Sequence, residues 1–317
     1  HLPLRGYRDL SIDFEVLPFE AKPLRVSESM MKSIRLFYKK VMPQELAIDP
    51  ERISAYRRIT GDRGPATPEQ FFFATTLPKI MQGMLDDGLG LNPASLLHLS
   101  SEIHRRSFSN GGMYKAKIRH VAAQDGPGGR TVTVDCDVVA GRTLIAQCQQ
   151  QFLVREATGT IAESFTGQAM VLSQSEDHDY ETARNLFDQT IVAPSDLNAF
   201  AHISGDLNPI HRDPAVALIA GLDSPIVHGQ WTAATACGLL VAEDRRLLRS
   251  RAEFLGPVLP GETLSFKGEV TGLNEGNEVC LVTVSNDQGP VLRLIATREC
   301  QPTALIFPGQ GAQRKGM

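Results

Sequence analysis

The spacing of apolar and polar residues predicts two short helices in succession in the second half of the chain. Leu197, Phe200 and Ala201 stand at positions i, i+3 and i+4, which is the spacing of one buried helix face. Gly205 is placed to end that helix. Asp213, followed by a proline, then supplies an N-cap for the apolar stretch "AVALIA".

A longer helix is expected over residues 226–242, "IVHGQWTAATACGLLVA". This segment is apolar nearly all round and rich in small residues, so the helix should be buried and wrapped by other elements. The following segments, "ETLSFKGEVTGL", "EVCLVTVSND" and "VLRLIATREC", have the composition of strands and are separated by turn sequences. A long central helix on an antiparallel sheet is the hot-dog architecture.

The same order of elements occurs twice. Residues 48–62, "IDPERISAYRRITGD", align without gaps on residues 192–206, "VAPSDLNAFAHISGD". Residues 101–121 also parallel residues 252–273. Two matched blocks in the same order predict a duplication.

The expected fold class is therefore α+β, a double hot-dog in which two antiparallel sheets each wrap a long central helix. The first unit should place its own long helix near residues 68–85, and its strands over "MYKAKIRHV", "RTVTVDCDVV" and "TLIAQCQQQFLV". Within that helix, residues 69–81 have two interpretations: a plain core helix, or one wall of a substrate tunnel. The predicted division of the chain is a linker or brace (1–45), a non-catalytic hot-dog (46–155), a connecting segment (156–188), a catalytic hot-dog (189–302) and the start of a further domain (303–317).

Composition narrows the class of protein. Hydrophobic residues make up 42% and charged residues 21% of the chain, with a net charge of −4, which does not favour nucleic acid as a partner. The sequence contains no run of roughly 18 apolar residues, so membrane insertion is not expected. The five cysteines are widely spaced and form no C-x-x-C motif, which indicates reduced thiols of a cytoplasmic protein and no zinc site.

Residues 202–213, "HISGDLNPIHRD", concentrate the groups that could carry chemistry: the hydroxyl of Ser204, the carboxylate of Asp206, the carboxamide of Asn208 and the imidazole of His211. Such residues after a helix-ending glycine often only form turn hydrogen bonds.

The first repeat argues for more than a turn. It keeps Asp62 but has Gly64 and Thr67 where the second repeat has Asn208 and His211. Because a turn alone would not require the histidine, the comparison predicts one catalytic and one structural unit.

The second unit resembles the MaoC-like family of (R)-specific enoyl hydratases and dehydratases. The pattern S-G-D-x-N-P-x-H, an intervening helix and I-V-H-G is matched at every position. The closing "TALIFPGQGAQRKGM" resembles the start of a malonyl/acyl-transferase domain. This order, over residues 46–317, resembles that of type I fatty acid synthases of the fungal and actinobacterial type.

The resemblance implies that Asp206 and His211 form an acid–base pair. We assign the C2 proton to His211 and the leaving hydroxyl to Asp206, and the opposite assignment stays open because coupled groups share their protons. The thioester oxyanion is expected at the amide of Gly229, at the positive end of the buried helix. His228 is expected to orient the site and Asn208 to position the pair or the water, whereas Ser204 is as compatible with a structural role as with a functional one.

The function implied is dehydration of (3R)-3-hydroxyacyl thioesters to trans-2-enoyl thioesters in fatty acid or related polyketide synthesis. The substrate would be carried on the phosphopantetheine of acyl carrier protein, with no metal and no other cofactor, and the other partners would be neighbouring domains of a multifunctional synthase. The alternatives are a free (R)-specific enoyl-CoA hydratase and a non-catalytic acyl-binding scaffold.

Overall fold

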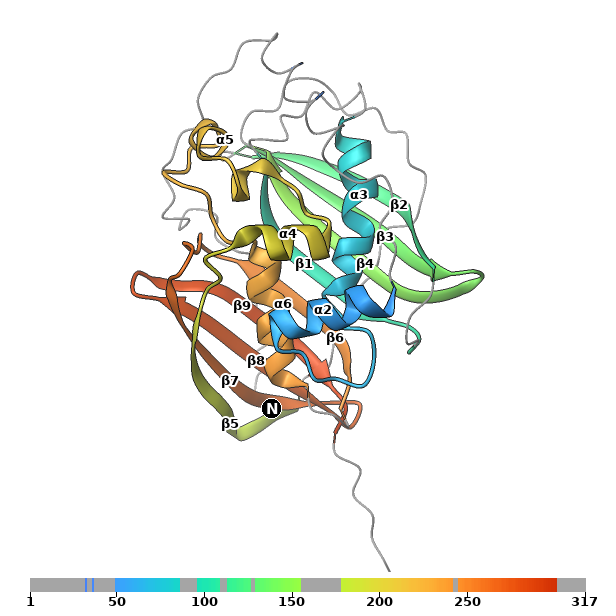
Figure 1. The fold of residues 1–317 in the computed structure, drawn as a ribbon. Helices are drawn as coiled ribbons and strands as arrows, with labels where there is room; N and C mark the ends of the chain where they lie inside the picture. The colour runs from blue at the N-terminus through green and yellow to red at the C-terminus, as the bar shows by residue number, and fades with distance from the viewer. Residues whose placement is uncertain are drawn as a thin grey trace, which may run out of the picture.

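One curved antiparallel sheet dominates the computed structural model (Figure 1). The structure describes residues 32, 36, 49–85, 96–108, 113–126, 129–154, 178–241 and 245–300. Within these residues, nine strands are hydrogen-bonded in the order β2-β3-β4-β1-β6-β9-β8-β7-β5. The strands are β1 (Leu96–Arg105), β2 (Tyr114–Gly126), β3 (Gly129–Ala140), β4 (Thr143–Val154), β5 (His178–Val192), β6 (Leu247–Phe254), β7 (Thr263–Asn274), β8 (Asn277–Asn286) and β9 (Gly289–Arg298).

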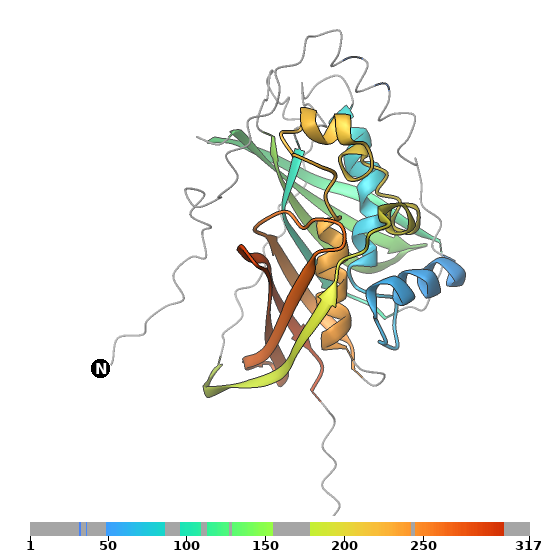
Figure 2. The ribbon, with the colours of Figure 1, turned by 60° about the vertical axis from the view of Figure 1, so that its left-hand side comes forward.

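Two long helices lie on the same face of the sheet, one on each half (Figures 1 and 2). They are α3 (Phe71–Leu85), which contacts β2 to β4, and α6 (Gly229–Leu240), which contacts β6, β8 and β9. Nearly every residue of α6 is buried, as its all-round apolar sequence predicts. The predicted double hot-dog fold and both of its central helices are therefore confirmed.

The two sheets that the repeat predicts are joined edge to edge. Strand β1 pairs with β6, and Ser101 lies directly opposite Ala252. These two residues are also the first positions of the aligned blocks, so a pseudo-two-fold axis passes between them. The pairing satisfies the backbone groups of two edges that would otherwise remain open.

Shorter helices begin and end in the same way in both units. Helix α2 (Pro50–Thr60) is capped by the side chain of Asp49, and α4 (Leu197–Ser204) by that of Asp196. The next residues, Gly61 and Gly205, have φ angles of 72° and 76°, which glycine adopts at little cost. The second unit then adds two further short elements, η3 (Pro209–His211) and α5 (Pro214–Ile219).

The two units share one core. The ring of Tyr56 in α2 lies 4.7 Å from that of Phe71 and 5.8 Å from that of Phe200 in α4, measured between centroids. The indole Nε1 of Trp231 in α6 donates a hydrogen bond of 3.0 Å to the carbonyl oxygen of Ile59. The units therefore depend on each other for burial.

Three strands were not expected from the sequence. β1 and β6 form the centre of the sheet, and β5 begins at His178, within the segment 156–188 that we predicted to connect the units. The predicted linker of residues 1–45, apart from residues 32 and 36, and the predicted domain start at 303–317 lie outside the described residues. None of the helices in the described part of the chain combines the length and the hydropathy of a transmembrane span.

Candidate active site

A cavity of about 160 Å³ lies between the two units. The second unit supplies Asp206, Asn208, His211 and Gly229 to its lining. The first unit supplies an apolar wall, made of residues from α3, β1 and β4: Phe73, Leu77, Met81, Leu96, Leu97, His98, Leu99 and Phe152. Residues 69–81 therefore fit both of their interpretations, since one face of α3 is core and another is cavity wall.

A chain of short-range hydrogen bonds shapes the polar turn after α4. The Ser204 hydroxyl accepts a bond from the Asp206 backbone N–H at 3.2 Å. In the same way, Asp206 Oδ1 accepts from the N–H of Asn208, and Asn208 Oδ1 from that of Ile210, each at 3.2 Å. Ser204 is buried and does not line the cavity, which agrees with a structural role, whereas Asp206 and Asn208 do line it.

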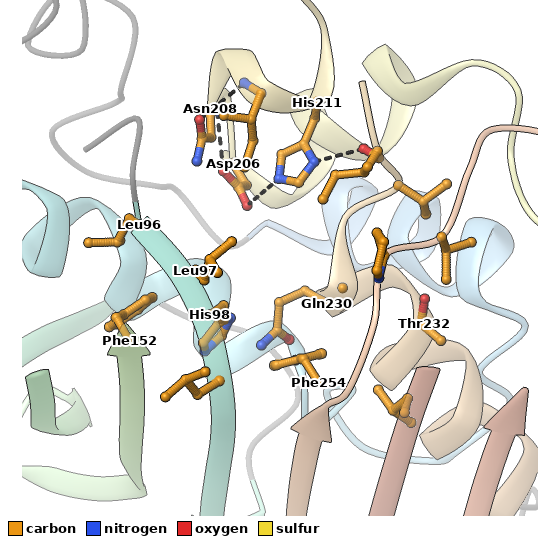
Figure 3. A pocket seen from close by; sticks show the side chains of 18 of the residues that line it. Leu96, Leu97, His98, Phe152, Asp206, Asn208, His211, Gln230, Thr232 and Phe254 are labelled. Carbon is orange, nitrogen blue, oxygen red and sulfur yellow. Dashed lines mark hydrogen bonds and ion pairs between the residues drawn. The ribbon is translucent and has the colours of Figure 1, made fainter. Parts of the chain in front are cut away.

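Asp206 and His211 face each other at the edge of the cavity (Figure 3). His211 Nε2 lies 3.9 Å from Asp206 Oδ2, and the two side chains are only 8% and 13% exposed. The other ring nitrogen, Nδ1, bonds to the carbonyl oxygen of Ile226 at 2.8 Å. Because a carbonyl oxygen can only accept, Nδ1 carries the proton of the neutral ring and Nε2 offers its lone pair towards Asp206.

His228 contacts both members of the pair. Its ring stacks on that of His211 with centroids 3.8 Å apart, and its Nε2 donates to the backbone carbonyl of Asp206 at 3.0 Å. Burial lowers the pKa of His228 well below its usual range, and the neighbouring His211 lowers this pKa further. His228 is thus a neutral ring, and its contacts are compatible with the orienting role expected from the sequence.

Burial also moves the pKa values of the pair towards each other. It raises the pKa of Asp206, although His211 and the Asn208 N–H oppose the shift. It lowers the pKa of His211, although the Asp206 carboxylate opposes this shift. The result is a neutral imidazole beside a carboxyl that holds its proton more tightly than in water, which is suited to proton transfer between the two groups and a substrate.

The N-terminus of α6 provides backbone donors at the cavity. Gly229 is the first residue of the helix, and the N-cap residue His228 makes no side-chain capping bond. The amide groups of this first turn carry the positive end of the helix dipole. A Cβ at Gly229 would lie 2.9 Å from the ring of Phe254, so packing as well as substrate approach requires glycine here.

Asp206, His211 and His228 are also the described residues whose donor atoms could hold a metal, since these atoms lie within 4.8 Å of one another. A metal site needs lone pairs that converge on one point. The imidazoles of His211 and His228 are stacked with only 26° between their planes, so their in-plane lone pairs run side by side. The geometry fits proton transfer better than metal coordination.

The polar cavity residues His98, Gln230 and Thr232 were not singled out from the sequence. His98 stacks between Phe73 and Phe152, with centroids at 5.0 and 4.7 Å, and its Nε2 bonds to Gln150 Oε1 at 2.9 Å. Burial lowers the pKa of His98 to about 4, so this ring is neutral. Gln230 lies on α6. The sequence signal for His98 and for Gln230 was a large polar side chain within a mostly apolar segment.

In the first unit, packed side chains occupy most of the space that corresponds to the cavity beside Asp206 and His211. Asp62 Oδ1 accepts a hydrogen bond of 2.9 Å from the N–H of Gly64 and lies 3.9 Å from Arg57 Nε. Thr67, in the place of His211, is buried. The hollow beside them has a volume of about 10 Å³, which is too small for an acyl chain. The prediction that this unit is non-catalytic is compatible with this packing.

The second unit is similar in sequence to known proteins. Residues 175–289 match the family model of the MaoC like domain. The fatty acid synthase subunit beta of Gibberella zeae is 35% identical over 171 residues, which are 50% of this chain and 8% of that protein. The 3-hydroxyacyl-thioester dehydratase X of Mycobacterium tuberculosis is 26% identical over 221 residues, which are 69% of this chain and 76% of that protein.

Solved structures support the fold. HtdX of Mycobacterium tuberculosis superimposes with a TM-score of 0.59 at 21% identity, covering 82% of this chain and 98% of that one. A MaoC-like dehydratase from Phytophthora capsici superimposes with a TM-score of 0.60 at 17% identity, covering 78% and 92%. The chain thus spans most of these structures but less than a tenth of the matched synthase subunit.

Proposed function

We propose that the chain catalyses the reversible dehydration of (3R)-3-hydroxyacyl thioesters to trans-2-enoyl thioesters. The match of residues 175–289 to the family model of the MaoC like domain supports this proposal. The observation that carries this proposal is the Asp206–His211 pair, which faces the end of an apolar cavity roomy enough for part of an acyl chain. Removing water across a carbon–carbon bond requires one base and one acid within reach of adjacent carbons.

In the proposed reaction, Nε2 of His211 takes the proton from C2. The electron pair of the broken C–H bond forms the C2–C3 double bond while the hydroxyl leaves C3. Asp206 protonates that hydroxyl, so that water departs, and the proton on His211 returns to Asp206 through solvent. The exchange of these two roles remains the alternative, because the two groups share their protons.

The thioester oxygen gains negative charge as the C2 proton leaves. We place this oxygen at the Gly229 N–H, where the start of α6 offers an oriented donor. His228 holds the backbone of Asp206, and Asn208 fixes the turn that carries the pair. This chemistry requires no metal and no organic cofactor beyond the carrier of the acyl group.

The carrier in this proposal is the phosphopantetheine of acyl carrier protein, in the cytoplasm, with neighbouring domains of a multifunctional synthase as further partners. The support is the similarity to fatty acid synthase beta subunits of several fungi. A free hydratase for coenzyme A thioesters is the second candidate, because the dehydratase X relative is a protein of similar size.

Hydration of crotonyl thioesters, followed by the loss of enoyl absorbance, tests the proposal. We expect turnover with crotonyl-acyl carrier protein, a lower kcat/KM with crotonyl-coenzyme A, and loss of turnover in His211→Ala. A higher kcat/KM with the coenzyme A thioester would favour the second candidate. Absence of hydration in a folded wild-type protein would contradict both enzymatic functions and favour the hypothesis of a non-catalytic acyl-binding scaffold.

A further inference from the structure

Gln230 places a carboxamide among mostly apolar residues of the cavity wall. Its side chain is only 3% exposed and lines the cavity wall. Neither its Nε2 nor its Oε1 atom has a hydrogen-bond partner among the described residues. A buried amide without a partner is costly, so a group that enters the cavity and pairs with it would be bound preferentially.

The neighbours of Gln230 do not explain its polarity. Figure 3 shows its amide between the catalytic pair and the rings of His98 and Phe254. His98 already bonds to Gln150 through Nε2, and its ring also bonds to the backbone of Ser100. Phe254 has no polar atom in its side chain. A purely apolar acyl chain would leave the Gln230 amide unpaired and without access to water.

The position of Gln230 defines which part of a substrate meets it. Gln230 follows Gly229, whose amide we assign to the thioester oxygen, and its side chain points towards the wall formed by the first unit (Figure 3). An acyl chain that enters this cavity from the thioester would pass the amide a few carbons beyond C3.

We propose that Gln230 is a specificity-determining residue that selects acyl chains with a second oxygen, a hydroxyl or a carbonyl, a few carbons beyond C3. This inference rests on the proposed function, since it assumes that the thioester lies at Gly229. A carboxamide suits either oxygen, because it both donates and accepts hydrogen bonds. An acyl chain with a second oxygen would form a hydrogen bond with the Gln230 amide, whereas a purely apolar chain would leave this amide unpaired. The difference in binding between the two chains is the selection.

Binding of unreactive saturated chains tests this selection without requiring turnover. Calorimetry would compare octanoyl-pantetheine with its 5-hydroxy and 6-hydroxy analogues. In the wild-type protein we expect at least one hydroxylated chain to bind about 3- to 10-fold more tightly than octanoyl, which is the range of one net neutral hydrogen bond. In Gln230→Met, of similar shape, this preference should vanish and octanoyl should bind more tightly than before.

Thr235→Val is the matched control. Thr235 lies on the same helix, is buried and has an unpartnered hydroxyl, but it does not line the cavity. Its substitution should leave the ratio of affinities unchanged, and Gln230→Leu provides a second variant should Gln230→Met not fold. The proposal is overturned if wild-type protein shows no preference, or if Gln230→Met weakens all chains equally. Failure of crotonyl hydration with the preference intact would contradict the proposed reaction instead.

Discussion

At the residue scale, Asp206 and Asp62 occupy the same place in the two units, one position after a helix-ending glycine. Of the two, only Asp206 faces a histidine, His211, at the edge of the cavity. We expect Asp206→Asn and His211→Ala each to lower kcat for thioester hydration on the order of 100-fold or more, which is the usual effect of losing a general acid or base. Steady-state kinetics with crotonyl thioesters measures this effect.

The control for these variants is the equivalent pair in the first unit. Asp62→Asn and Thr67→Ala should leave kcat nearly intact, because the hollow beside them cannot admit a chain. Equal losses in the two pairs of variants would show that the units do not divide their roles in this way.

The protonation of His211 gives a second test. Burial is the main reason that its pKa lies below the usual range, and the Asp206 carboxylate opposes the shift. An NMR titration of the His211 ring should therefore give a pKa below about 6.5. Asp206→Asn removes the attracting charge, so the pKa should fall further and the neutral form should persist to lower pH. A rise in this pKa in the variant would contradict the electrostatic account of the pair.

Glu69, a buried residue outside the candidate site, makes stability depend on pH. It accepts a hydrogen bond of 2.8 Å from the Ser250 hydroxyl, and burial raises its pKa to about 7 despite the nearby Arg105. Below about pH 4.3 the carboxyl is protonated in the folded and the unfolded chain alike. As pH rises, the unfolded chain loses this proton first, so the free energy of unfolding falls until the folded carboxyl ionises near pH 7.

Glu69→Gln removes this dependence. Relative to the variant, the wild-type protein should lose about 3 kcal/mol of stability between pH 4.3 and pH 7, because each unit of pKa shift corresponds to about 1.4 kcal/mol. Urea unfolding at several pH values measures the difference. Parallel stability curves for the two proteins would mean that Glu69 is not buried as described.

At the scale of elements, the contact between α6 and the end of α2 leaves no space for a side chain. A Cβ at Gly238 would lie 2.9 Å from the Thr60 carbonyl oxygen and 3.0 Å from the Asp62 nitrogen. Backbone atoms cannot swing aside as a side chain can, so Gly238→Ala should cost about 1–3 kcal/mol of stability. Thermal unfolding would show the loss as a lower Tm.

Gly256→Ala is the comparison for this variant. The nearest atom to a Cβ there is 3.7 Å away, an ordinary contact. Its Tm should change little, and a fall as large as that of Gly238→Ala would point to a cause other than crowding between the helices.

Much of the fold follows from local patterns that tertiary contacts did not override. The helix caps at Asp49 and Asp196, the all-round apolar α6 and the alternating strands β7 to β9 are each encoded by neighbouring residues. Strand β5 was missed because it is an edge strand, and seven of the ten residues over 183–192, where burial is described, are exposed. Its pattern therefore lacks the buried face that marks a strand.

The candidate site could be predicted only where its residues are neighbours in the sequence. The turn from Ser204 to His211 is contiguous, so its groups could be read together. His98 and Gln230 reach the cavity from separate elements, and nothing in their own segments indicates that these elements meet. Contact between the units decides their role, and that contact is not visible in a local pattern.

At the scale of the whole molecule, the joined sheet gives the first unit, to which we assign no catalytic group, a part in the cavity. The pairing of β1 with β6 holds the first unit against the second in a fixed register. This register brings β1 residues and one face of α3 to the cavity that ends at Asp206 and His211. The first unit thereby supplies one wall of the cavity to the second unit, which on its own would expose β6 as an open edge.

This arrangement predicts that substitutions in the first unit change the chain length accepted by the second. Leu77 and Met81 lie one helical turn apart on the cavity face of α3. Leu77→Trp and Met81→Trp should fill that space, so kcat/KM for dodecenoyl thioesters should fall at least about 10-fold, as expected when binding loses more than about 1.4 kcal/mol. Crotonyl thioesters, which are too short to reach this wall, should be hydrated as before.

Lys79→Trp adds the same bulk to an exposed position of α3 and should affect neither substrate. Equal losses for short and long chains in Leu77→Trp would instead indicate damage to the Asp206–His211 pair through the shared core. A selective loss for long chains would locate the acyl group across the boundary between the units. Because α3 contributes no catalytic group in this mechanism, only a steric effect on the chain can produce that selectivity.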